Sequence, residues 1–294
     1  MRTKRCRFDC RLAPRGAVVV RVLVLCGYGF NCEEETAAGY RLAGAEPTVA
    51  HTADWFDGLV QLADFEILHF PGGFSFGDDL GSGQVFANRL KNGRFANGGR
   101  VWDAILAFLG AGGHIIGICN GFQILVRAGL VPNLAGIYAQ EVALAPNGSG
   151  KFEDRWVRCQ ATGLGVGLFG EREFDLPVRH GEGRLEFADP QVRDLAQERG
   201  LVVLTYLDAD GGPAVQYPAN PNGADLAAAA LLSADGQVFG MMPHPEAYLT
   251  FINHPDWGGR QRRGEVVEVA DTGVGLFCAW VAAAAGKAAA KAAA

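Results

Sequence analysis

The pentapeptide Gly117-Ile118-Cys119-Asn120-Gly121 constrains the fold of this 294-residue chain more than any other segment. An apolar run precedes it at residues 114–118, and a helical pattern follows at residues 121–128. This is the context of a nucleophile elbow, with cysteine where the pattern GxSxG has serine. Glycine is needed on both sides because the backbone turns sharply, and a side chain there would collide with the adjoining strand or helix. The alternative is a buried cysteine in an incidental GxCxG.

The first half of the chain alternates short apolar runs with helical patterns. We expect strands at residues 18–26, 47–51, 66–70 and 114–118, and helices at residues 33–43, 82–90, 101–109 and 121–128. This alternation predicts an α/β fold, namely a mainly parallel open sheet with helices on both faces. After residue 138, short runs at residues 156–160, 201–207, 226–232 and 238–242 predict an antiparallel extension of the same sheet. A closing helix is expected at residues 273–285.

One domain, residues 18–285, accounts for this pattern. Residues 1–17 form a basic N-terminal extension with six cationic side chains against Asp9 alone. A transit peptide is the other interpretation of this segment, but transit peptides are rich in serine and this segment has none. Residues 286–294 (GKAAAKAAA) are expected to be a flexible, alanine-rich tail.

Composition excludes several classes of function. The net charge of −6 gives the chain no general attraction for nucleic acid or for an anionic membrane surface. No apolar run reaches the roughly 18 residues of a membrane span. The seven cysteines are scattered without a CxxC pair, so they suggest neither a disulfide framework nor a structural zinc site. We therefore expect a cytoplasmic protein.

A cysteine nucleophile needs a base and a group that orients the base. Among six histidines, only His244 follows a strand with a carboxylate beside it, in the sequence Met-Pro-His-Pro-Glu at residues 242–246. In an extended segment His244 and Glu246 would point to the same side. A surface turn is the alternative, whereas His69 and His114 lie inside expected strands and are predicted to be core residues.

The sequence FPGGFSFGDD at residues 70–79 follows the third expected strand. Ligands of open α/β sheets bind at the carboxyl ends of the strands. The bare backbone at Gly72 and Gly73 could therefore approach a substrate and stabilise an oxyanion. The alternative is a simple glycine turn.

Together, PGGFSFGDD, GICNGFQ and MPHPE resemble the class I glutamine amidotransferases, which have a flavodoxin-like fold. Further matching stretches are Asn31-Cys32-Glu33, His-Gly-Glu-Gly-Arg at residues 180–184 and Asn-Pro-Asn-Gly at residues 220–223. The resemblance covers roughly residues 20–280 and is strongest to the glutaminase subunits, of the PurQ type, of phosphoribosylformylglycinamidine synthases. The N-terminal extension, residues 247–269 and the tail depart from the family pattern.

The resemblance implies a Cys-His-Glu triad of Cys119, His244 and Glu246. It places backbone donors for the oxyanion at Gly73 and Asn120. It also places three further residues against the substrate, and these are Gln123, His180 and Gly181. For His180 and Glu182 a structural role is the alternative. The implied reaction hydrolyses glutamine through a Cys119 thioester to glutamate and ammonia.

Using that ammonia for synthesis requires ATP, and the chain offers no convincing nucleotide site. Residues 165–170 match GxGxxG literally but open no clear βαβ unit, and residues 150–152 lack most of a P-loop. We expect no cofactor in this chain. The resemblance implies an ATP- and Mg-dependent synthetase subunit and a small bridging subunit as partners. That synthetase would convert formylglycinamide ribonucleotide to formylglycinamidine ribonucleotide in purine biosynthesis.

Two other functions fit an α/β fold with an elbow cysteine. A deglycase or intracellular peptidase of the same fold would carry its histidine close after the nucleophile, where this chain has Asn120. A non-catalytic regulator would lack a triad member, and all three are present. The glycine-rich loop at residues 74–83 is expected either to gate activity or to shape the pocket rigidly.

Overall fold

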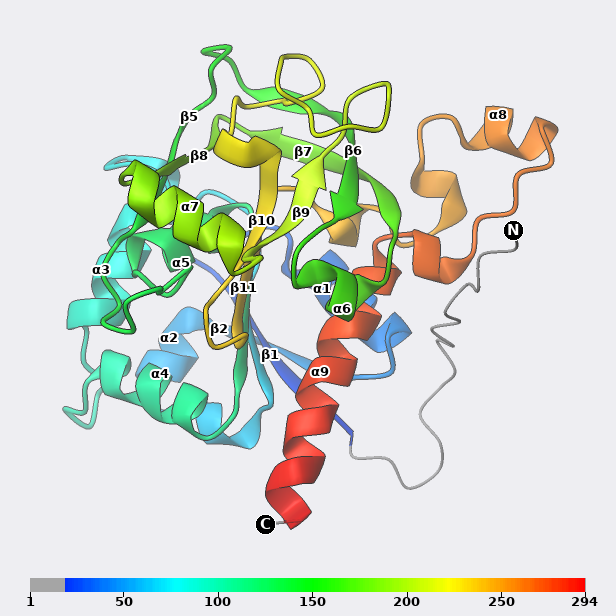
Figure 1. The fold of residues 1–294 in the computed structure, drawn as a ribbon. Helices are drawn as coiled ribbons and strands as arrows, with labels where there is room; N and C mark the ends of the chain where they lie inside the picture. The colour runs from blue at the N-terminus through cyan, green and yellow to red at the C-terminus, as the bar shows by residue number, and fades with distance from the viewer. Residues whose placement is uncertain (1–18, 294) are drawn as a thin grey trace.

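The computed structural model describes residues 19–293, and the extension expected at residues 1–17 lies outside the described residues. A nine-stranded sheet with the order β2-β1-β3-β4-β11-β10-β9-β6-β7 forms the centre of the molecule (Figure 1). Its parallel half consists of β2 (Glu46–His51), β1 (Arg21–Cys26), β3 (Ile67–Phe70), β4 (His114–Ile118) and β11 (Val238–Met241). Every residue of β3, β4 and β11 is buried, as expected for strands covered on both faces.

The antiparallel half confirms the predicted extension except at residues 238–242, where β11 pairs in parallel with β4. It consists of β10 (Ala228–Leu232), β9 (Val202–Tyr206), β6 (Glu153–Ala161) and β7 (Glu173–His180). The sequence did not predict β7, nor a separate two-stranded sheet of β5 (Val142–Pro146) and β8 (Glu182–Phe187). Exposed and buried positions are mixed in β7 and β8, so neither strand has the continuous apolar run that marks β1 or β4.

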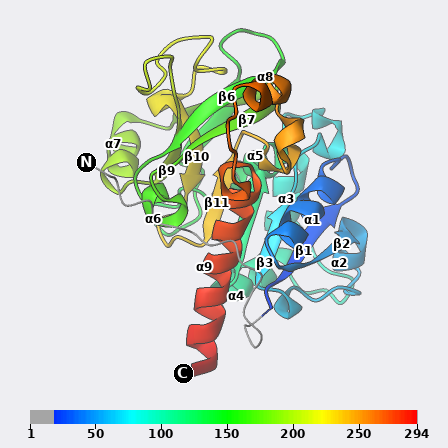
Figure 2. The same ribbon diagram turned by 90° about the vertical axis from the view of Figure 1, so that its right-hand side faces the viewer.

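Helices cover both faces of the sheet (Figures 1 and 2). On one face, α1 (Glu33–Leu42) packs against α9 (Val274–Ala293), which also contacts α6 (Gly165–Phe169). The other face carries α3 (Gln84–Asn92), α4 (Val101–Gly110) and α5 (Asn120–Arg127). This arrangement confirms the predicted open α/β sheet with two helical layers. The remaining α-helices are α2 (Thr52–Phe56), α7 (Pro190–Glu198) and α8 (Trp257–Arg262).

The C-terminal helix is longer than predicted. We expected it to end at residue 285 and a flexible tail to follow, but α9 continues to Ala293. The physical reason is composition, because alanine has the highest intrinsic helix propensity and the two lysines of the tail are also good helix formers.

The segment at residues 247–269 leaves the body of the sheet and carries α8, which lies beside β6 and β7 in Figure 2. Arg260 of α8 forms an ion pair with Asp175 of β7 and so ties this excursion to the sheet. Among the described residues, no helix is both long enough and apolar enough to cross a bilayer.

His69 and His114 are core residues, as predicted. They lie on β3 and β4 with exposed fractions of 0 % and 6 %. The Nδ1 atom of His69 is hydrogen-bonded to the Tyr40 hydroxyl at 2.9 Å. Burial lowers the pKa of His69 to about 3, so its ring is neutral at physiological pH.

Candidate active site

Cys119 sits at the sharp turn between β4 and α5. Its backbone angles, φ 50° and ψ −104°, are unusual for a residue other than glycine. A Cβ atom at Gly121 would lie 1.9 Å from the carbonyl oxygen of Phe70, and one at Gly117 would lie 2.7 Å from Gly121. These distances confirm the steric reason for glycine on both sides. The turn places the thiol at the N-terminus of α5, close to the positive end of the helix dipole.

His244 and Glu246 follow β11, the strand next to β4. Met241 is the register partner of Ile118, and the amide of Cys119 donates a hydrogen bond to the Met241 carbonyl at 2.8 Å. The two parallel strands therefore deliver the thiol and the imidazole to the same edge of the sheet, although more than a hundred residues separate them in the chain.

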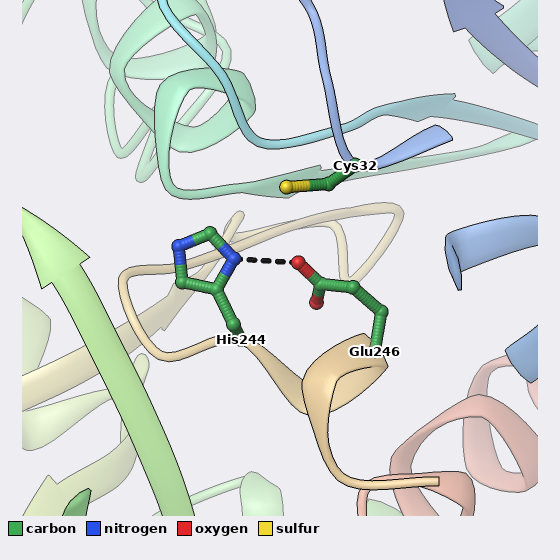
Figure 3. Close-up of side chains that lie close together, drawn as sticks. All are labelled: Cys32, His244 and Glu246. Carbon is green, nitrogen blue, oxygen red and sulfur yellow. Dashed lines mark hydrogen bonds and ion pairs between the residues drawn. The ribbon is translucent and has the colours of Figure 1, made fainter. Parts of the chain in front are cut away.

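The imidazole and the carboxylate are in direct contact. His244 Nδ1 lies 2.5 Å from Glu246 Oε1, and the two side chains are only 3 % and 2 % exposed (Figure 3). The prediction that they face one site is confirmed, but the proposed extended backbone is wrong. Residues Pro245–Ala247 form a turn of 3-10 helix. Pro245 sits in its first turn, where the missing N–H of proline costs no hydrogen bond.

The charges around His244 favour its protonated form. Burial is the largest influence and lowers its pKa, but the Glu246 carboxylate and the Cys119 thiolate act in the opposite direction. The net result is a pKa well above the ordinary value for histidine. A protonated imidazole held against the Glu246 carboxylate can donate a proton to a leaving group, which a cysteine nucleophile requires of its partner.

The loop after β3 lies against this pair. A Cβ atom at Gly72 would be 2.7 Å from Cε1 of His244, so only glycine lets the backbone pass there. Gly73 has φ +144°, and its backbone packs on that of Gly29 and Phe30. The structure therefore brings the predicted Gly73 to the site, and its role as an oxyanion donor stays a prediction.

Asn120 and Gln123 are the polar residues at the start of α5, and both are buried. The Asn120 side chain accepts a hydrogen bond from the Ser75 amide at 3.0 Å and donates one to Gln123 Oε1 at 2.9 Å. Gln123 in turn donates to the carbonyl of Glu182 at 2.5 Å. This chain of bonds joins the nucleophile turn to the loop at residues 74–83 and to the segment at residues 180–184.

His180 and Gly181 lie where β7 ends. His180 Nδ1 contacts Asn147 Oδ1 at 3.0 Å, and the Asn147 amide donates to the Gly181 carbonyl at 2.9 Å. Burial lowers the pKa of His180 to about 3, so its ring is neutral. These contacts are all internal and agree with the structural alternative for His180. Substrate contact at His180 and Gly181 stays a prediction.

Sequence reasoning missed two participants of this site. Cys32, the residue before α1, interacts with the His244 ring, and the Arg179 carbonyl lies 3.6 Å from the Cys119 sulfur. Cys32 follows the carboxyl end of β1, the edge where ligands of open sheets bind, and this position was the available signal. The Arg179 contact is made by a backbone carbonyl, which every residue has, so the sequence could not reveal it.

The described cysteines differ in state. Cys26, Cys32, Cys119 and Cys159 are free thiols. Cys278 is disulfide-bonded, which the scattered spacing did not predict. The GxGxxG match at residues 165–170 forms α6, which connects the antiparallel strands β6 and β7. The expectation that this match is fortuitous is therefore consistent with the fold, because no βαβ unit surrounds it.

An open α/β sheet with an elbow cysteine, and with a histidine–glutamate pair just after the neighbouring strand, is typical of amidotransferases that use a cysteine nucleophile. Residues 19–277 match the family of CobB/CobQ-like glutamine amidotransferase domains, and the chain belongs to this family.

Individual relatives agree with this assignment. A phosphoribosylformylglycinamidine synthase subunit PurQ of Methanococcus maripaludis is 39 % identical over 85 % of this chain and 92 % of its own length. A phosphoribosylformylglycinamidine synthase of Drosophila melanogaster is 34 % identical over 82 % of this chain, which matches 18 % of that longer protein. In the solved structure of PurLQS from Thermotoga maritima, a chain that is 28 % identical superposes with a TM-score of 0.60 over 84 % of this chain and 97 % of its own.

Proposed function

We propose that this chain is the glutaminase subunit of a phosphoribosylformylglycinamidine synthase. It hydrolyses glutamine to glutamate and ammonia, and the ammonia reaches a synthetase subunit that makes formylglycinamidine ribonucleotide in purine biosynthesis. The observation that carries the proposal is Cys119 on its elbow beside the buried pair of His244 and Glu246. The names of the relatives described above support the substrate class, and we place the pathway in the cytoplasm.

Cys119 is the proposed nucleophile on the side-chain amide of glutamine. Backbone N–H groups at Gly73 and Asn120 would hold the oxyanion of the tetrahedral intermediate, a contribution of several kcal/mol where measured in other enzymes. His244 then gives its proton to the departing ammonia and afterwards takes a proton from the water that hydrolyses the thioester. Glu246 orients the ring and stabilises its charge through the contact at Nδ1.

We further propose a division of work between subunits. The synthetase would bind ATP and Mg, a small bridging subunit would complete the complex, and ammonia would travel between the active sites. The Drosophila relative supports this arrangement, because the segment similar to this chain is a small part of one long synthase there. The name of the Thermotoga assembly, PurLQS, is consistent with separate subunits.

The test is a glutaminase assay of the chain alone and with a purified synthetase subunit, ATP and acceptor. Cys119→Ala should abolish glutamine-dependent synthesis, while synthesis from added ammonium survives because the ATP chemistry lies elsewhere. Cys26→Ala, on β1 and outside the triad, is the matched control. Glutamine hydrolysis by Cys119→Ala at the wild-type rate would refute the assignment.

A further inference from the structure

Cys32 lies beside the catalytic pair but does not belong to the triad. Its sulfur, a nitrogen of His244 and a carboxylate oxygen of Glu246 all lie within 4.8 Å of one another. Figure 3 shows Cys32 extending from the segment before α1 toward the space between the ring and the carboxylate. The three side chains come from two segments that are distant in sequence and meet only in the folded chain.

One oxygen of this cluster, Oε2 of Glu246, is buried without a hydrogen-bond partner. Buried polar atoms are normally hydrogen-bonded to protein or to an ordered molecule. The backbone of Gly72 packs directly on the cluster, because a Cβ atom there would lie 2.7 Å from Cε1 of His244 and 3.1 Å from the Cys32 sulfur. A half-buried thiol beside a buried imidazole and a buried carboxylate with one unsatisfied oxygen is a set of donor atoms suited to a metal ion.

We propose that Cys32, His244 and Glu246 bind a divalent transition-metal ion of borderline softness, for which Zn²⁺ is the test ion, and that the bound ion inactivates the enzyme. One thiolate, one imidazole and one carboxylate match the ligands that Zn²⁺ prefers. Mg²⁺ and Ca²⁺ prefer sites built from oxygen alone and are excluded by the sulfur.

The geometry needs only small adjustments. In a tetrahedral site with bonds of about 2.0–2.3 Å, neighbouring ligand atoms are about 3.2–3.8 Å apart. The widest pair must therefore close from its limit of 4.8 Å by about 1 Å, and the contact of 2.5 Å between His244 and Glu246 must open by a similar amount. Cys32 loses its thiol proton to solvent on binding, and water completes the coordination.

Metal binding and catalysis exclude each other in this arrangement. An ion bound to a nitrogen of His244 occupies the ring that must exchange protons with Cys119 and with the leaving ammonia. It also separates Glu246 from the ring. The inhibition therefore rests on the proposed function, whereas binding of the ion does not.

Binding is measured on the full chain, by competition with a chromogenic chelator for Zn²⁺ and by the thiolate-to-metal absorption band of the Co²⁺ form. We expect one ion per wild-type chain, and Cys32→Ser should weaken binding at least tenfold and remove the band. Cys119→Ala and the control Cys26→Ser should keep both. The reverse result, with binding lost in Cys119→Ala and kept in Cys32→Ser, would assign the ion to the nucleophile and overturn the proposal.

Inhibition is measured for each protein as its rate of glutamine hydrolysis with Zn²⁺ divided by its own rate without Zn²⁺. One equivalent should suppress the wild type and EDTA should restore it, while Cys32→Ser should need at least tenfold more ion. Equal sensitivity of the two proteins would overturn the inhibitory role. If no protein hydrolyses glutamine, the proposed function fails and the binding experiment still decides the metal site. Thermal unfolding of Cys32→Ser and Cys32→Ala checks that the variants are folded.

Discussion

Replacing Glu246 with glutamine keeps the shape of the side chain and removes its charge. The pair with His244 is buried, and its atoms are 2.5 Å apart, so solvent screens it little. A hydrogen bond to a charged group contributes about 1.5–3 kcal/mol. If the charge is needed mainly when the ring is protonated, kcat/KM should fall about 10- to 150-fold. His244→Ala should cost more, because it removes both the acceptor and the donor of the proton.

The pH profile separates this explanation from a simple packing defect. Glu246 is one of the groups that raise the pKa of His244. Without its charge the ring loses its proton at lower pH, so the alkaline limb of kcat/KM should move to lower pH in Glu246→Gln. Glu66→Gln removes a carboxylate that pairs with Arg21 at 2.9 Å, at the amino end of β3, and is the matched control.

Steady-state glutaminase kinetics from acid to alkaline pH provide the measurement. A loss in Glu246→Gln as complete as that in Cys119→Ala would refute the orienting role and require Glu246 to act on the substrate directly. An unchanged alkaline limb would refute the electrostatic part of the reasoning.

Three further predictions concern stability and regulation. Gly121→Ala should lower the free energy of unfolding by about 3 kcal/mol, the upper end of the usual cost of overpacking, since its Cβ would lie 1.9 Å from the Phe70 carbonyl oxygen. Gly110→Ala on α4 has open space and should stabilise by about 0.5–1 kcal/mol. Urea unfolding of both variants tests this. Between pH 6.5 and about 3, the buried His69 binds a proton only in the unfolded state. Stability should therefore fall as the pH drops through this window, and it should fall less in His69→Gln. Equal urea midpoints of the wild type at pH 7 and pH 5 would contradict this prediction. The isolated chain should hydrolyse glutamine slowly and accelerate when a ligand-loaded synthetase binds, because the loop at residues 74–83 is tied to Asn120 next to the nucleophile; equal turnover in both states rules out gating.

Sequence alone predicted the parts of the site that steric rules fix. The elbow at Cys119 was recognisable because no residue but glycine fits on either side, and β4 and β11 were recognisable as short apolar runs. The antiparallel strand β7 was not, because it lacks a continuous apolar run, although its buried Phe174, Leu176 and Val178 stand at every second position as in a half-buried strand. The contact between His244 and Glu246 was predicted, but through an extended backbone instead of the turn at Pro245–Ala247.

Cys32 shows where sequence reasoning ends. The stretch Asn31-Cys32-Glu33 matches the family pattern and follows β1, but the sequence gives Cys32 no role. The packing of α1 beside the loop after β3 brings its sulfur to His244. The length of α9 was missed for a different reason. Low complexity in an alanine-rich tail suggests flexibility, but alanine and lysine individually favour helix.

The position of β11 between β4 and β10 has a consequence for synthesis of the chain. Until the ribosome has released residues 238–241, one edge of β4 has no partner, and the unpaired backbone groups of such an edge can recruit strands of other chains. The antiparallel strands that emerge earlier cannot cover it, because each of them reaches the parallel half only through β11. Insertion of this late strand therefore closes the exposed edge in the same event that carries His244 to Cys119, so a nascent chain gains activity only when it loses its most aggregation-prone surface.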